Sequence, residues 1–267
     1  MTARLHVEIE DHIATVRLDR PDKNNAIDFA MFDAFIETGR LLSTDRSVRA
    51  VVLHGAGNHF CAGIDLSAFQ GEGIGAAGSG RMDARENSDA NFFQSAARVW
   101  QEIPVPVIAA IHGAAFGGGL QIALGADIRY ATADAQLSVM EIKWGIIPDM
   151  AISISGHHTV AIDRLKELAF TGRVISGVEA LASGLITDLK DDPYRAAVDL
   201  ARDICNRSPD AIRAIKKLFD DSWRSAPREF LRREAELQMG VMGGRNHMEA
   251  VMANLEKRLP NFDDPVP

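Results

Sequence analysis

The sequence predicts an α/β fold in which strand–turn–helix units follow one another, with a purely helical region towards the C-terminal end. The first observation is a repeat: VVLHGAGNHFCAGIDL and VIAAIHGAAFGGGLQIAL both place His-Gly after an apolar strand and before a glycine-containing turn. A unit repeated in this way is typical of a wound α/β architecture. The second observation is that only helical patterns remain after about residue 193. We therefore expect an α/β core over residues 1–192 and a helical region over residues 193–267.

The bulk properties narrow the class of protein. With 267 residues, the chain is long enough for one large domain with a buried active site. Its formal net charge of −8 argues against nucleic acid or an anionic membrane as the main partner. The first residues lack the apolar run of a signal peptide, and no run of about 18 apolar residues predicts a membrane span. The two cysteines, Cys61 and Cys205, have no ligand-like spacing and favour a reducing, cytoplasmic setting.

The first elements follow from side-chain periodicity. Residues 5–9 and 13–18 alternate apolar and polar side chains, which predicts a β-hairpin. The loop at 20–28 is rich in Pro, Asn and Asp, and Asp28 is placed to cap the amphipathic helix that follows. The nearly continuous apolar run within 48–57 then predicts a short buried strand.

The rest of the chain continues this pattern. Residues 91–103 predict an amphipathic helix, and a strand at 107–113 follows a Pro-Val-Pro turn. The segment 71–80 contains G-x-G-x-x-G, but it lacks the preceding strand and following helix of a dinucleotide site, so a surface loop is the better interpretation. Four helical patterns end the chain, at residues 194–207, 209–223, 227–242 and 247–259.

Glycine is concentrated in two turns that follow the buried strands. Gly63 lies in CAGID, and Gly117, Gly118 and Gly119 are consecutive in FGGGL. Glycine lets backbone approach a ligand closely, and the start of a helix presents free N–H groups. If the two turns converge, their N–H groups can form an oxyanion hole from backbone alone. The alternative is that the glycines only permit close packing of helix against strand.

These motifs together resemble the crotonase superfamily, the enoyl-CoA hydratase/isomerase group. The stretches that carry the resemblance are RPDKNNAID, HFCAGIDL, PVIAAIHGAAFGGGLQIALGADIRYATADAQLSVMEIKWGIIPD, FTGRVISGVEALASGLI and NLEKRLPNF, in this order. The resemblance implies a crotonase-type spiral of ββα turns, with a C-terminal helical region that covers the site and assembles homotrimers or homohexamers. It implies an unsaturated fatty acyl-CoA thioester as substrate, in chemistry of the β-oxidation type. No metal or separate cofactor is expected, because CoA is part of the substrate.

The resemblance also places site residues on this sequence. The oxyanion hole falls on the backbone N–H groups of Ala62 and Gly118, and two such donors stabilise an enolate by roughly 2.7–4 kcal/mol each. The path of CoA is lined by the consecutive residues Ala62, Gly63, Ile64 and Asp65. Lys23 and Lys257 are candidates to contact the CoA phosphates, and each is equally well explained as a solvated surface charge.

Two positions carry the expected acid–base chemistry. Hydratases of this group have a glutamate where this chain has Gln121, and a second one where it has Glu141. An amide can orient a water molecule or a carbonyl, but it cannot act as a base. The hydratase pair is therefore incomplete in this chain. Losing one acid–base group typically costs about 10²–10⁴-fold in rate.

A further carboxylate, Asp149, follows Glu141 by eight residues. This spacing resembles Δ3,5-Δ2,4-dienoyl-CoA isomerases, although those enzymes carry an aspartate at the position of Gln121. Single-acid enoyl-CoA isomerases need only the equivalent of Glu141. Asp149 can instead cap a helix in MAISIS, and Glu141 can be a solvated charge at a strand end.

We therefore expect double-bond isomerisation through an enolate, with Glu141, Asp149 and Gln121 as the candidate catalytic residues. Two other functions stay open. One is hydration of a 2-enoyl-CoA, with Gln121 positioning the water. The other is a non-catalytic scaffold that binds acyl-CoA. The sequence does not fix the length of the acyl chain.

Overall fold

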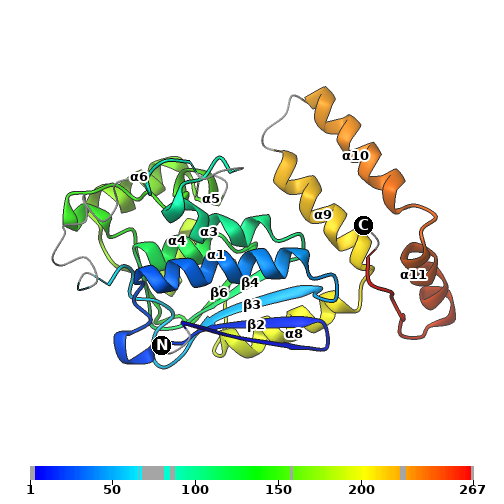
Figure 1. Ribbon diagram of the computed structural model, residues 1–267, viewed down its shortest axis with the longest axis horizontal. Helices are drawn as coiled ribbons and strands as arrows, with labels where there is room; N and C mark the ends of the chain where they lie inside the picture. The colour runs from blue at the N-terminus through cyan, green and yellow to red at the C-terminus, as the bar shows by residue number, and fades with distance from the viewer. Residues whose placement is uncertain are drawn as a thin grey trace.

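The computed structural model describes residues 4–65, 67, 81–84, 88–156, 159–222 and 227–265. Its centre is a six-stranded sheet in the order β1-β2-β3-β4-β6-β9 (Figure 1). β1 and β2 form the predicted antiparallel hairpin, and the other neighbouring strands in this sheet pair in parallel. The strands are β1 (Leu5–Glu10), β2 (Ile13–Leu18), β3 (Ala50–Gly55), β4 (Val107–Ile111), β6 (Ile128–Ala131) and β9 (Asp188–Leu189).

The central strands of the sheet are buried on both faces, because helices cover both. In β3, Val51 belongs to one core cluster and its neighbour Val52 to another, as the two-residue period of a strand requires. β4 is buried along its whole length, as expected at the centre of a parallel sheet. Figure 1 shows α8 on one side of the sheet and the helices α1, α3 and α4 on the opposite side. These helices are α1 (Phe29–Thr44), α3 (Phe92–Glu102), α4 (Gly118–Leu124) and α8 (Pro193–Cys205).

Local sequence signals set the starts of the two long helices on the first face. Asp28 caps α1 as predicted, because its Oδ1 accepts a hydrogen bond from Met31 N at 2.9 Å. α3 begins with a reciprocal capping box between Asn91 and Gln94. The two helices pack through the edge-to-face pair of Phe35 and Trp100, whose ring centroids lie 6.0 Å apart.

A second, smaller sheet brings the two glycine turns together. It contains β5 (Ala114–Phe116), β7 (Gln136–Ser138) and β8 (Ile175–Ser176). Two isolated bridges, Cys61 with Ala115 and Ile27 with Ile64, hold the segment 61–65 between β5 and the start of α1. Short elements around this region are the 3₁₀ helices η1 (Pro21–Lys23) and η3 (Glu141–Trp144), and the α-helices α5 (Ile152–Ser155), α6 (Ile162–Thr171) and α7 (Gly177–Ser183).

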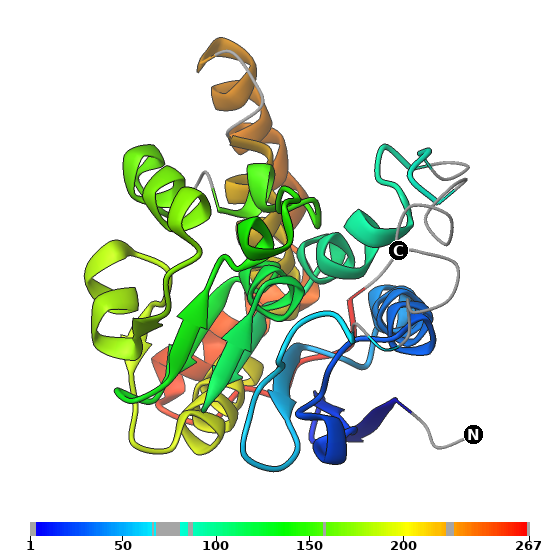
Figure 2. The ribbon, with the colours of Figure 1, turned by 90° about the vertical axis from the view of Figure 1, so that its left-hand side faces the viewer.

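The last three helices extend away from the sheet, at the opposite end of the molecule from α5 and α6 (Figure 1). They are α9 (Pro209–Ser222), α10 (Pro227–Val241) and α11 (Arg245–Glu256), and α10 and α11 pack on α9. Figure 2 shows α10 projecting beyond the rest of the chain. Lys216 secures α9: its buried Nζ donates to Asp127 Oδ2 at 2.7 Å and to the carbonyl of Val105 at 3.1 Å.

The end of the described chain returns to the start of β3. Arg49 Nη2 donates to the carbonyl of Phe262 at 2.9 Å, and Arg46 Nη1 donates to the carbonyl of Pro265 at 3.2 Å. Asn246 adds a reciprocal pair of bonds with the backbone of Asp263. The segment after α11 is therefore tied to residues more than 200 positions earlier in the chain.

The structure tests the expected architecture, but it does not test the expected domain boundary or the expected loop at 71–80. The wound α/β architecture and the helical C-terminal region are confirmed. α8 follows the expected boundary at residue 193 yet packs on the sheet, so the division into 1–192 and 193–267 stays a prediction. The glycine-rich segment 71–80 lies outside the described residues. None of the helices in the described ranges is long and apolar enough to cross a membrane.

Candidate active site

Glu141 and Gln121 meet in the interior of the molecule. Glu141 begins η3 and is 8% exposed, while Gln121 projects from α4 and is 1% exposed. Gln121 Nε2 donates to Glu141 Oε1 at 2.6 Å. The second oxygen, Oε2, is buried and has no hydrogen-bond partner in the described part of the chain. Glu141 is therefore a buried carboxylate with one oxygen held and the other available, and it is not a solvated charge at a strand end.

The surroundings of Glu141 favour proton uptake. Burial raises its pKa above the ordinary value, and the nearby charge of Asp149 adds to this rise, while the hydrogen bond from Gln121 lowers the pKa. A base works best when its pKa lies near the operating pH. The net direction is upward, so Glu141 has the electrostatic character of a general base.

Asp149 lies close enough to Glu141 to influence it, and it does not cap a helix. The cap position of α5 is occupied by Ala151, and no side chain bonds to the free N–H groups there. The interpretation of Asp149 as a helix cap is therefore wrong, because the chain makes a left-handed turn at Ala151 before α5 begins. Burial raises the pKa of the half-buried Asp149 carboxyl.

The three consecutive glycines have different neighbours. Gly117 has φ of +50° and ψ of −120°, and a Cβ on it would lie 3.2 Å from Glu141 Oε1. A Cβ on Gly119 would lie 2.6 Å from the carbonyl oxygen of Cys61. Gly119 therefore serves close packing, whereas Gly117 lets the backbone pass directly beside the carboxylate of Glu141.

The two glycine turns converge, as the sequence suggested. Gly63 has φ of +91°, and a Cβ on it would lie 2.7 Å from the carbonyl oxygen of Phe116 and 3.9 Å from the backbone nitrogen of Gly118. The Gly118 N–H donates to no acceptor within the described residues. Because the carbonyl of Gly117 accepts from Gln121 N, the N–H of the same planar peptide points the opposite way, out of the start of α4.

The assignment of Ala62 as the other oxyanion donor is wrong. The Ala62 N–H donates to the carbonyl of Asn24 at 2.9 Å, so it is already used in holding the loop. The Ile64 N–H has no protein acceptor in the described ranges. Gly63 O accepts from Ile27 N, so the N–H in the same Gly63–Ile64 peptide points away from Ile27. The sequence could not reveal this, because the positive φ at Gly63 decides which way that peptide faces.

The expected CoA contacts are only partly brought together. Asp65 is ion-paired with Arg20 at 2.7 Å and accepts two bonds from Ser67, so it braces the loop. Lys23 is exposed in η1. Lys257 is exposed at the C-terminal cap of α11, which lies at the far end of the molecule from α5 and α6 (Figure 1). A single chain therefore does not place Lys257 at the site around Glu141.

Other residues at the site were missed by sequence reasoning. A Cβ on Gly118 would lie 2.9 Å from Met150 Sδ and 3.4 Å from Ile27 Cδ1, so these two side chains wall the turn together with Ile64, which the sequence had already placed here. The sequence signal that could have indicated these wall residues is their apolar character beside the polar motifs. Cys61 also lies here, but it is fully buried, and burial raises the pKa of its thiol to about 12, which excludes it as a nucleophile.

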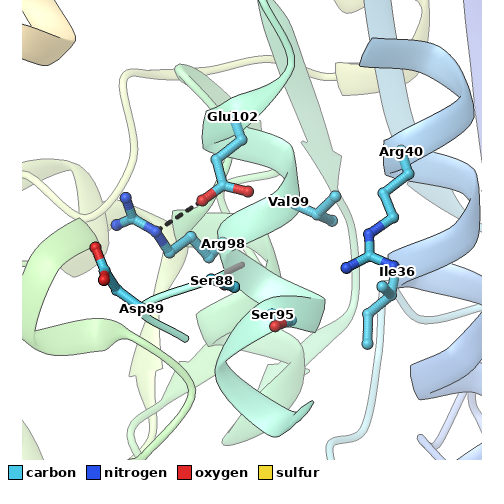
Figure 3. Close-up of a pocket in the computed structure, with 8 residues that line it drawn as sticks. All are labelled: Ile36, Arg40, Ser88, Asp89, Ser95, Arg98, Val99 and Glu102. Carbon is cyan, nitrogen blue, oxygen red and sulfur yellow. Dashed lines mark hydrogen bonds and ion pairs between the residues drawn. The ribbon is translucent and has the colours of Figure 1, made fainter. Parts of the chain in front are cut away.

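A polar hollow elsewhere on the surface is a less suitable site. It has a volume of about 410 Å³ and lies beside α1 and α3 (Figure 3). Arg98 in its wall is engaged with Glu102 at 2.9 Å, and the Ser95 hydroxyl bonds to the carbonyl of Asn91 within its own helix. None of the residues singled out from the sequence lines it.

Comparison with known proteins agrees with the geometry. The profile of the enoyl-CoA hydratase/isomerase family matches residues 8–265. The mitochondrial Δ(3,5)-Δ(2,4)-dienoyl-CoA isomerase of Mus musculus is 32% identical over 259 residues, 93% of this chain and 78% of that protein. The mitochondrial methylglutaconyl-CoA hydratase of the same species is 30% identical over 96% of this chain and 82% of its own length.

A solved structure gives the same result for the fold. The crystal structure of an enoyl-CoA hydratase from Bacillus anthracis superposes with a TM-score of 0.90 at 27% identity, over 98% of this chain and all of that one. The match extends through the sheet, the glycine turns and the C-terminal helices. The chain belongs to the enoyl-CoA hydratase/isomerase family, within the crotonase superfamily.

Proposed function

We propose that this enzyme moves a double bond in an unsaturated acyl-CoA, with Glu141 as the group that takes and returns the proton. The observation that carries the proposal is the state of the Glu141 carboxylate, which is buried with Oε1 held by Gln121 and Oε2 unpartnered in the described chain. In a 3-enoyl-CoA, Oε2 removes a proton from C2 and the same carboxyl returns one to C4. The bond moves from C3–C4 to C2–C3, and no other reactant is consumed.

Two backbone donors support the enolate in this proposal. Removing the C2 proton puts negative charge on the thioester oxygen. The Ile64 and Gly118 N–H groups are unused within the described residues and belong to neighbouring turns. We assign them as the oxyanion hole, with Ile64 in place of Ala62. Each such donor is worth roughly 2.7–4 kcal/mol at a developing oxyanion.

Asp149 is proposed as a second acid for conjugated substrates. With a 3,5-dienoyl-CoA, Glu141 removes the C2 proton and Asp149 in its acid form delivers one to C6. Its raised pKa and its nearness to Glu141 support this role. The 32% identity with a Δ(3,5)-Δ(2,4)-dienoyl-CoA isomerase supports it independently.

Hydration is the second candidate, because relatives of the chain include a named hydratase. It would need a second group to activate water. Gln121 is an amide, and both ends of that amide are engaged with protein groups: Nε2 with Glu141, and Oε1 with the backbone nitrogen of Met150. The isomerase proposal uses the side chains as they lie, whereas hydration requires Gln121 to turn to a water molecule.

The deciding experiment incubates the enzyme with 2-enoyl-, 3-enoyl- and 3,5-dienoyl-CoA and follows hydration and double-bond migration separately. Migration in the second or third substrate that is faster than hydration of the first supports isomerisation. Faster hydration of 2-enoyl-CoA overturns it. Binding of all three without turnover would favour the acyl-CoA scaffold.

We also propose a homo-oligomer, either a trimer or a hexamer. Large apolar side chains on the last helices are exposed in the single chain, including Met239 at 77% and Leu255 at 73%. In this proposal a partner subunit brings Lys257 to the CoA phosphates, where Lys23 is the other candidate contact. Light scattering gives the mass, and a monomer would remove Lys257 from the CoA site. No cofactor is assigned.

The cellular compartment stays a prediction. The dienoyl-CoA isomerases similar to this chain include a mitochondrial protein of Mus musculus and a peroxisomal one of Arabidopsis thaliana. The cytoplasm was favoured from the cysteines and the N-terminal sequence, and localisation of the expressed protein would decide between these compartments.

A further inference from the structure

Gln121 joins two parts of the site that are far apart in sequence. Its Nε2 donates to Glu141 Oε1 at 2.6 Å, and its Oε1 accepts from Met150 N at 2.8 Å. The orientation of the amide is fixed by chemistry, since an ionised carboxylate can only accept and a backbone N–H can only donate. At 1% exposure, neither bond is weakened by competing solvent.

The bond to Met150 holds the segment that carries the second carboxylate. Met150 lies between Asp149 and Ala151, and Ala151 has φ of +64°, a strained value for a residue with a side chain. No side-chain cap supports the short helix α5 that follows. The Met150 side chain also packs towards Gly118, where a Cβ would meet its sulfur at 2.9 Å. Displacing Met150 would therefore move Asp149 and disturb the glycine turn together.

We propose that Gln121 is the positioning residue of this site, which acts without touching the substrate. Through one amide it fixes Glu141 so that Oε2 alone exchanges protons, and through Met150 it fixes Asp149 relative to Glu141. This role rests on the proposed function in one respect, which is that Glu141 is the base. It also explains why the position is an amide: no carboxylate could donate to Glu141 unless it were itself protonated.

Two substitutions separate the bonds. Gln121→Met keeps the length of the side chain and removes both hydrogen bonds. Gln121→Glu keeps the acceptor for Met150 N, but it sets two carboxylate oxygens against each other where the present contact is 2.6 Å. Such a pair holds one shared proton, and in that form the new carboxyl donates to Glu141 as the amide does. The Glu variant should therefore work best at low pH and lose activity as the shared proton leaves.

The chain offers a matched control in Asn246. This buried amide also donates to a carboxylate, Asp210 Oδ2 at 2.8 Å, and accepts from a backbone nitrogen, that of Asp263, at 2.9 Å. It belongs to α11, away from Glu141. Asn246→Leu therefore reports what the loss of a buried bridging amide does to folding alone.

The experiment measures kcat and KM from about pH 5 to 9, a range that spans the titration of shifted carboxylates, on whichever of the three acyl-CoA substrates the wild type converts. We expect Gln121→Met to lower kcat at least about tenfold with little change in KM. The acid limb of its rate profile should move to higher pH, because a hydrogen bond to the charged form of Glu141 is lost. Asn246→Leu should lower the melting temperature without moving that limb.

A readout without turnover completes the test. The ¹³C carboxyl resonance of Glu141, assigned by its absence in Glu141→Gln, should titrate at higher pH in Gln121→Met than in the wild type. An unchanged midpoint together with an unchanged acid limb would overturn the positioning role, even if the variant melts earlier. The identity of the converted substrate decides the proposed function separately, since the shift is expected for a hydratase as much as for an isomerase.

Discussion

Replacing Gly117 with alanine tests how closely the backbone must approach the base. Gly117 has φ of +50° and ψ of −120°, a conformation that L-residues adopt only under strain of about 1–3 kcal/mol. The new methyl group would lie 3.2 Å from Glu141 Oε1. This distance is shorter than nearly all real contacts of a Cβ atom, so either the carboxylate or the turn has to move by a few tenths of an ångström.

Backbone strain at Gly117 should appear in the melting temperature, and displacement of the Glu141 carboxylate should appear in kcat. For a domain of this size, 1 kcal/mol corresponds to roughly 2–4 °C in melting temperature, so strain alone should lower it by about 2–12 °C. A displaced catalytic group can cost up to about 10²-fold in rate for a shift of about 1 Å. For the smaller shift at Glu141, we expect a loss in kcat of at least about tenfold.

Gly243 provides the matched control. It also has a positive φ, of +77°, but a Cβ there meets no atom within 4 Å. Gly243→Ala should lower the melting temperature and leave kcat unchanged. Steady-state assays and thermal melts of both variants make the comparison. If Gly117→Ala keeps more than half of the wild-type kcat while melting no earlier than Gly243→Ala, the backbone does not constrain Glu141 and the reasoning fails.

Changes at four further positions have expected outcomes. Glu141→Gln should lower turnover by about 10²-fold or more and leave CoA binding nearly intact. This variant should also gain stability relative to the wild type as pH rises. Burial raises the pKa of Glu141 in the folded wild type, so stability that is present below the unfolded-state pKa is lost as pH rises through the folded-state pKa. Denaturant titrations of both proteins at pH 5 and pH 8 would show the difference. Gly118→Pro removes the donor N–H and should cost about 10²-fold in kcat, whereas Gly118→Ala keeps the donor and should lose less; equal losses would indicate packing against Met150 alone. Gln121→Glu should hydrate crotonyl-CoA faster than the wild type, and equal rates would mean that Gln121 is not what limits hydration. Lys216→Met should lower the free energy of unfolding by about 1–3 kcal/mol, because the hydrogen bonds from its buried Nζ to Asp127 and to the carbonyl of Val105 are lost.

Local signals in the sequence predicted what local forces decide. The hairpin, the Asp28 cap and the convergence of two glycine turns follow from periodicity, side-chain capping and a repeated motif, and all three are present. The predictions that were wrong concern features set by the orientation of a peptide plane or by a long-range contact. Ala62 was chosen in place of Ile64 because the flip at Gly63 is invisible in residue types.

The site itself shows the same division. Glu141 and Gln121 could be named from the sequence, since their residue types limit what chemistry they can do. Their 2.6 Å contact depends on how α4 packs beside η3, which no pattern within either segment encodes. For Asp149 the sequence left a helix cap open beside the expected catalytic role, and only the left-handed turn at Ala151 shows that the helix starts beyond its reach.

The ties between the start of β3 and the last described residues have a consequence for synthesis of the chain. Arg49 is buried in the finished fold, and its guanidinium finds the carbonyl of Phe262 only after more than 200 further residues have been made. A nascent chain can assemble the hairpin and the first helices early, but this corner can close only once residues 262–265 have been made. Closure of the corner around Arg49 is thus a late step of folding, and a change within residues 262–265 would act on it first.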